Sequence, residues 1–112
     1  MEKDFVPYEE SLALKELGFE EFCIGNYADD KKHTLFTDKG RRGKVDAPTF
    51  SQAFRWFREK HGLSAIVSRF GYAIENEFGQ IIYNISDDEN PLCYEESEIL
   101  CLKKLIGIVN EK

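Results

Sequence analysis

The stretch PTFSQAFRWFREKHG, residues 48–62, sets the architecture of this chain. Its apolar side chains recur at helical spacing, whereas Arg55, Arg58 and Glu59 lie away from the apolar face. Proline is accepted in the first turn of a helix, and the glycine after the histidine favours its end. We therefore predict a helix from Pro48 to His61 that packs on a sheet. Its apolar stripe consists of Phe50, Ala53, Phe54, Phe57 and His61.

Strand-like segments follow this helix. Three segments have the composition of strands: Leu63 to Phe70, Tyr72 to Glu77 and Gln80 to Ser86. The pair Phe78 and Gly79 predicts a tight turn before the last of them. Gly71 is compatible with a turn or with a bulge inside one long strand. The acidic run from Ser86 to Glu89, with Asn90 and Pro91, predicts a loop, and a final helix is predicted from Tyr94 to Val109.

The residues before the central helix predict one helix and one hairpin. Pro7 followed by Glu9 and Glu10 is typical of a helix start, and Gly18 of a helix end, so we predict a helix from Pro7 to Leu17. Two short strands, containing Phe22 to Tyr27 and His33 to Thr37, would be joined by the polar turn of residues 29–32. Residues 38–44 contain two glycines and no apolar side chain, which predicts an exposed, mobile loop.

A short motif occurs twice. Tyr8 to Ser11 and Tyr94 to Ser97 share the sequence Tyr-Glu-Glu-Ser, and each copy precedes a leucine-rich helix. The leucine patterns that follow are offset differently from the motif, whereas a duplication would keep one offset. We favour convergence on good helix-start chemistry over duplication.

These elements predict an α+β fold. We expect an antiparallel sheet of four to five strands in the order α-β-β-α-β-β-(β)-α, covered by the second and third helices, with the first helix at an edge or end. A chain of 112 residues is the size of one domain, so we expect residues 1–112 to form a single α+β domain.

Composition limits the compartment and the redox chemistry. We see no apolar run long enough to cross a membrane and no signal peptide, so we expect a cytoplasmic protein without a membrane partner. Cys23, Cys93 and Cys101 are odd in number and widely spaced, which fits neither a disulfide framework nor a zinc site. We expect them to be reduced packing residues.

The charge is unevenly distributed along this acidic chain, whose net charge is −6. Residues 31–69 contain ten basic and three acidic residues, a net charge of +7, and the rest of the chain carries −13. Such a basic segment is one hypothesis for a nucleic-acid or anion contact, with Trp56 stacking on bases. The alternative is a solvated basic loop with Trp56 in the core. The candidate contact residues are Lys39, Arg41, Arg42, Lys44, Arg55 and Arg58.

Catalytic and cofactor motifs are not evident. We predict no catalytic, cofactor-binding or metal-binding residues and no cofactor, because the two histidines and three cysteines show no catalytic or zinc spacing. His61 at the end of its helix favours an interaction with the helix dipole. An enzyme would instead need a pocket around Cys23, His33 or Glu75.

Two longer segments carry a resemblance. Residues 47–63, with the pattern APxxxQAFRWFREKHGL, and residues 94–106, with YEESExxCLKKLI, resemble small uncharacterised proteins of gut Bacteroidetes genomes and their phages. With residues 7–19 the likeness covers most of the chain. It implies an association with a phage or other mobile element, and it implies no activity and no site residues.

The leading functional hypothesis is a small non-enzymatic accessory or protein-interaction protein. Its partner would be an unknown protein or a second copy of the chain, and Trp56, Tyr8 and Tyr94 are the candidate contact aromatics if they lie in one surface patch. The alternative is a nucleic-acid-binding protein that uses the basic segment 31–69.

Overall fold

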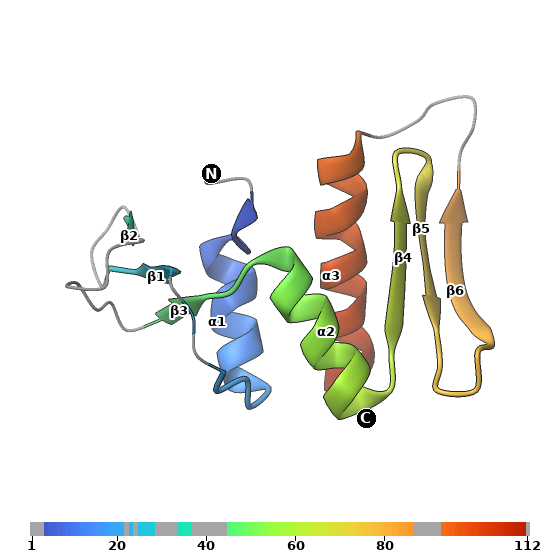
Figure 1. Cartoon of the computed structure of the whole chain (residues 1–112), viewed down its shortest axis with the longest axis horizontal. Helices are drawn as coiled ribbons and strands as arrows, with labels where there is room; N and C mark the ends of the chain where they lie inside the picture. Colours follow the sequence, from blue (N-terminus) through green and yellow to red (C-terminus); the bar gives the residue numbers. More distant parts are fainter. Residues whose placement is uncertain are drawn as a thin grey trace. The chain divides into compact units, whose positions relative to one another are not determined.

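The computed structural model describes residues 4–21, 23, 25–28, 34–36, 45–86 and 93–111. Its contacts group the chain into two compact units, Met1–Ala53 and Phe54–Lys112, which we describe one at a time. Three helices and six strands are present in the described residues, so the α+β class is confirmed. Figure 1 labels these elements along the chain.

The first unit consists of helix α1 and a three-stranded antiparallel sheet. The strands β1 (Gly25–Tyr27), β2 (Leu35–Phe36) and β3 (Val45–Ala47) pair in the order β2-β1-β3. Helix α1 (Tyr8–Glu16) packs on β3, and Tyr27, Val45 and Ala47 form the buried cluster beneath it. The Tyr27 hydroxyl donates a hydrogen bond to the carbonyl oxygen of Val6 at 2.7 Å, which ties β1 to the chain before α1.

The predicted ends of the first helix agree with the structure. Pro7 is the N-cap, Glu9 and Glu10 lie in the first turn, and Gly18 follows the helix with a φ of 102°. Acidic side chains at the positive end of the helix dipole stabilise the helix, and glycine accepts the left-handed conformation at little cost. The predicted pairing of two short strands is also confirmed, since β1 pairs antiparallel with β2.

Helix α2 (Phe50–His61) begins two residues after Pro48. The hydroxyl oxygen of Thr49 accepts a hydrogen bond from the Gln52 amide at 3.2 Å, which satisfies one of the main-chain donors left free at a helix start. The predicted helix and its apolar stripe are therefore confirmed, with Phe50, Ala53 and Phe57 buried. Because α2 spans the division between the units, the prediction that it packs on a sheet stays a prediction.

The second unit consists of an antiparallel sheet covered on one face by helix α3. Strands β4 (Ser64–Ser68), β5 (Gly71–Glu75) and β6 (Ile81–Ser86) form consecutive hairpins, and β5 lies between the other two. Helix α3 (Tyr94–Asn110) packs on β4 and β5 (Figure 1). Cys93 is the N-cap of α3, and its sulfur accepts a hydrogen bond from the Glu96 amide at 3.4 Å.

The register assigns each strand residue to one face of this sheet. Ala65, Ile74 and Tyr83 lie side by side on the face that α3 covers, as do Val67, Tyr72 and Ile85, because directly paired residues share a face. Gly71 opens β5 directly after the two-residue turn of Arg69 and Phe70, so it is neither a mid-strand bulge nor the turn itself. The irregularity lies elsewhere, at Ile74 and Glu75, where Ile82 has no partner in β5.

Three expectations need correction. The described strands form two sheets of three, not one sheet of four to five, because β3 pairs with β1 and not with the later strands. The strand Val45–Ala47 was not predicted, since three residues between a basic loop and Pro48 carry too little pattern. The first helix packs on β3, an edge strand of the first sheet, rather than beside one large sheet.

Several expectations concern residues outside the described ranges. They are the polar turn of residues 29–32, the loop of residues 38–44 and most of the acidic loop before α3. The single-domain prediction also stays a prediction. Helix α3 begins at Tyr94 as predicted and covers the second sheet as predicted.

Candidate interaction surface

Strand β6 forms an edge of the second sheet. It pairs with β5, and the described residues place no strand on its other side. Ile81, Ile82 and Ile85 are 58%, 46% and 41% exposed. An edge strand presents unpaired N–H and C=O groups along one side and is therefore a template for pairing with another chain. We call β6 and the exposed side chains beside it the open edge.

Helix α3 contributes to the open edge on the face of the sheet that it covers. The Lys104 ammonium lies 4.3 Å from the centroid of the Tyr83 ring, which fixes the register between α3 and β6. Leu100 lies four residues before Lys104, about 6 Å along the helix axis, and Ile85 lies two strand residues beyond Tyr83, about 6.6 Å. Because α3 and β6 run in opposite directions (Figure 1), these two exposed side chains occupy the same stretch of the edge.

A hydrogen-bonded turn holds the other end of the edge. The Asn76 side-chain oxygen accepts hydrogen bonds from the Phe78 amide at 2.9 Å and the Gln80 amide at 3.0 Å, and its amide group donates to Gln80 Oε1. Such Asx-type contacts stabilise the turn locally. Phe78, at the tip, is 78% exposed. The turn thus presents an aromatic ring next to Ile81.

Exposed apolar side chains are concentrated in this part of the chain. Seven large hydrophobic side chains of the described residues are exposed, and all but Ile66 lie between Phe78 and Leu100. Apolar residues scattered singly over a surface need no explanation, but a cluster at an edge marks an interaction site. The six are Phe78, Ile81, Ile82, Ile85, Tyr94 and Leu100.

Acidic residues are frequent in the sequence that contains the open edge. Between Phe70 and Leu100 the sequence contains eight acidic residues and no lysine or arginine. Glu75 pairs with Ile81 at the end of the edge where β6 begins, whereas the Glu77 carboxylate lies against Gly62, before β4. Glu96 lies at the opposite end, one helical turn before Leu100 on the same side of α3. Strand β6 itself has no charged residue and no proline.

The opposite face of the second sheet has a shallow depression of about 140 Å³. Ala73 and Asn84 lie side by side there, and Ile66 beside them is exposed. Small side chains on this face make the depression shallow. Its lining includes two isoleucines, Ile66 and Ile85, and Ile85 also belongs to the open edge.

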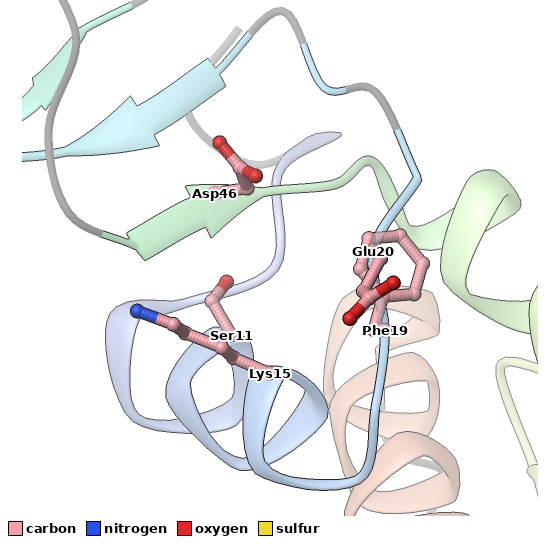
Figure 2. Close-up of a pocket in the computed structure, with 5 residues that line it drawn as sticks. All are labelled: Ser11, Lys15, Phe19, Glu20 and Asp46. Atoms are coloured by element: carbon pink, nitrogen blue, oxygen red, sulfur yellow. The ribbon is translucent and has the colours of Figure 1, made fainter.

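The first unit contains a separate cavity of about 330 Å³. Figure 2 shows Ser11 and Lys15 projecting from α1, Asp46 from β3, and Phe19 and Glu20 from the chain after α1. The Ser11 hydroxyl donates a hydrogen bond to the Val6 carbonyl oxygen at 3.0 Å, so its proton is already engaged. The lining combines one ammonium group with two carboxylates.

Cys23 is a poor nucleophile in this structure. Burial, together with the charges of Asp46 and Glu21, raises the pKa of its thiol to about 12. Its sulfur donates a hydrogen bond to the Glu21 carbonyl oxygen at 3.4 Å. Burial likewise raises the pKa of Cys101 to about 12. Both groups are neutral near pH 7, whereas thiol chemistry requires the thiolate.

The candidate aromatic residues do not share one patch. Trp56 is 4% exposed, and its ring packs edge-on against Phe57 at 5.0 Å and His61 at 4.9 Å. Tyr8 is half-buried and packs edge-on against Tyr27 at 5.6 Å. Tyr94 is exposed at the start of α3. The expectation that Trp56 is exposed is therefore wrong, and its alternative, a core position, is confirmed.

The basic candidates divide into two groups. Arg55 and Arg58 are exposed on α2. Lys39, Arg41, Arg42 and Lys44 lie outside the described residues, as does His33. Glu75 lies on β5, beside Ile81 rather than in a cavity.

Two further results concern metals and membranes. Within the described ranges, no group of three or more His, Cys, Asp and Glu side chains is arranged to hold a metal ion. None of the three described helices has the length and hydropathy of a membrane span.

Sequence reasoning did not identify the open edge. The alternating residues of β6 are typical of a strand, but the pattern does not say which side of the strand stays uncovered. The sequence does carry one signal for this surface. Residues 70–100 combine acidic and apolar residues and include no lysine or arginine.

No protein-family model, curated protein or solved structure matches this chain. The function is therefore argued from the geometry of the open edge.

Proposed function

We propose that this chain is a non-enzymatic protein-interaction protein and that the open edge is its contact surface. The observation that carries the proposal is the combination of an uncharged edge strand with three exposed isoleucines. Burying apolar surface stabilises an association by about 25 cal/mol per Å² before its entropic costs, and an added strand also pairs the free main-chain groups.

The nature of the open edge supports a protein ligand over a small molecule. A small-molecule site is concave and encloses its ligand, whereas a strand edge offers an extended row of donors and acceptors. Phe78 and Leu100 extend the apolar surface beyond β6. An extended polypeptide is the ligand that matches this shape.

Site-specific photo-crosslinking in cells of the source organism tests the proposal. A photoreactive amino acid in place of Asn84, exposed on β6, should give a discrete protein adduct. The same group in place of Glu59, exposed on α2, is the matched control and should give none. The Asn84 adduct should disappear when Ile82→Lys is added. Equal adducts from both positions, or none from Asn84, would count against the proposal.

Nucleic-acid binding by residues 31–69 remains the alternative proposal. The exposed side chains of Arg55, Arg58 and Lys60 on α2 support it. If it holds, binding to labelled DNA or RNA weakens steeply with salt and is lost in the Arg41→Glu, Arg42→Glu double variant, because phosphate contacts release counterions. Binding that is unchanged by this charge reversal would exclude nucleic-acid binding through Arg41 and Arg42.

A further inference from the structure

The open edge also defines the chemistry of its partner, and this step rests on the proposed function. Strand β6 is six residues long, so an added strand pairs over at most about 20 Å. Its main-chain groups specify an extended partner, because a helix has no free N–H and C=O groups along its side. The apolar side chains beside β6 require apolar residues at alternate positions of that partner.

Charge selects among extended partners. The edge lies within a segment of the sequence that has eight acidic residues and no lysine or arginine, with Glu75 at one end of β6 and Glu96 at the other. Two described cations of this unit are engaged with aromatic rings, Lys104 with Tyr83 and Arg69 with Phe70. A strand with basic residues at both ends would meet opposite charge at each end, which speeds encounter and fixes the register.

The same charges disfavour a second copy of the chain. Two copies of β6 paired antiparallel would bring the end beside Glu75 close to the partner end beside Glu96. Like charges in such positions repel. A basic partner avoids this repulsion, so the observations favour a different polypeptide over self-pairing.

We propose that the open edge binds an extended, basic segment of another protein as a fourth strand of the second sheet. The segment has apolar side chains at alternate positions over about six residues and a lysine or arginine at each end. Its apolar residues on the α3 side contact Ile85 and Leu100. Its basic ends lie near Glu96 and near Glu75.

Titration of the full chain with synthetic peptides tests this proposal. The probe is an eight-residue peptide in which valine and threonine alternate between two terminal lysines, and its control has glutamate at both ends. We expect the lysine peptide to bind about tenfold more tightly, the effect of a few exposed ion pairs, and to lose about tenfold in affinity between low and high salt. In amide-resolved NMR spectra, the shifted signals should be those of β6 and of α3 from Glu96 to Leu100, while those of β4 stay unchanged.

Two matched pairs of variants distinguish the effect of charge on peptide binding from the effect of losing a side-chain contact. Ile82→Lys and Ile82→Glu remove the same apolar group, so Ile82→Lys should weaken the lysine peptide several-fold more than Ile82→Glu. Glu96→Lys should weaken it, whereas Glu95→Lys should not, because adjacent helical residues point about 100° apart. Thermal unfolding of each variant shows whether it is folded.

Three outcomes would overturn the proposal. They are equal affinity for the two peptides, signal shifts that leave β6 unchanged, and a concentration-dependent dimer of the pure chain that Ile82→Lys dissociates. The last outcome would assign the edge to a second copy. Each is distinguishable from failure of the proposed function, since photo-crosslinking at Asn84 reports any protein partner, whatever its charge.

Discussion

The two sheets of this protein differ in how their edges are built. In the first sheet the edge strands β2 and β3 have two and three residues, and the central strand β1 is buried. In the second sheet the edge strand β6 has six residues, and five of them are exposed. Short edge strands are one way in which proteins prevent unwanted pairing. The described edge strands of the first sheet are that short, whereas both edges of the second sheet, β4 and β6, are longer and uncharged, and β6 is the more exposed of the two.

The same residue type therefore has different roles in a central strand and in an edge strand. Ile74 on β5 is fully buried and has a strand on each side, so its side chain contributes to stability. Ile82 on β6 is 46% exposed and has no partner in β5. An exposed isoleucine adds little to the folded chain, and its apolar surface remains available for binding.

Substitutions in the central strand and in the edge strand should differ most in the free energy of unfolding. Ile74→Ala should lower the free energy of unfolding by about 2 to 5 kcal/mol, because it leaves a cavity in the core. Ile82→Ala should lower it by about 0.5 kcal/mol or less, as is usual for surface positions. Urea unfolding followed by the fluorescence of Trp56, the single tryptophan, measures both. Equal losses would show that β6 is covered in solution.

A second experiment tests how tightly β6 is held to β5. Gly71 has a φ of +151°, and a Cβ there would overlap the main-chain carbonyl oxygen of Ile85. Gly71→Ala should therefore lower the free energy of unfolding by about 1 to 3 kcal/mol and release the end of β6. Urea unfolding gives the loss, and amide exchange of Ser86 reports the release.

Gly79→Ala is the matched control for this substitution. Gly79 also has a positive φ, +78°, but a Cβ there would meet nothing within 4 Å. Gly79→Ala therefore causes the same kind of backbone strain as Gly71→Ala, without the steric overlap. If the two alanines cost the same, the close contact between β5 and β6 does not hold the edge in place.

A third experiment compares the two units through their buried thiols. Cys23 in the first unit and Cys101 in the second both have a pKa of about 12, so at pH 8 they stay neutral and react when the chain opens. We expect Cys23 to react about tenfold faster, a difference of about 1.4 kcal/mol, because the first unit has the shorter strands. Mass spectrometry after timed alkylation measures both rates, with the exposed Cys93 as the internal reference.

One common rate for Cys23 and Cys101 would contradict this expectation. The chain would then open as one cooperative unit, and the prediction of a single domain would gain support. Separate rates that change independently in urea would assign each unit its own stability.

The smallest expected effect concerns the contact between α3 and β6. Lys104→Met should lower the free energy of unfolding by about 0.5 to 1 kcal/mol, because it removes the cation from the Tyr83 ring. Lys103→Met, at the exposed neighbouring position, changes the net charge equally and should cost less. Thermal unfolding compares the two, and equal shifts would mean that the ring contact adds no stability.

The helices and the second sheet could be predicted from the sequence because their patterns are local. The stripe of α2, the proline and acidic residues before α1, and the turn at Phe78 and Gly79 each act over a few residues. Trp56 was misplaced because the buried face of α2 is wider than the stripe. It follows Ala53 by three residues, which extends that face by about 60°.

The division into two sheets and the open edge could not be predicted. Pairing between β1 and β3 joins residues about 20 apart along the chain, and the local pattern of neither strand names its partner. The exposure of Ile81 and Ile85 depends on β6 being the last strand of its sheet, which is a property of the pairing order. Among the candidate site residues, Tyr94 is the one that lies exposed in the acidic and apolar segment.

The unpaired Ile82 also bears on fibril formation. Cross-β growth requires long strands that stack in one unbroken register, so that each added strand offers the same edge to the next. The irregularity at Ile74 and Glu75 interrupts that register in β6, and a bulge increases the local twist of its strand. An apolar edge that can pair with one added strand is therefore a poor template for repeated strand addition. We therefore expect this irregularity to limit templated aggregation at the exposed edge.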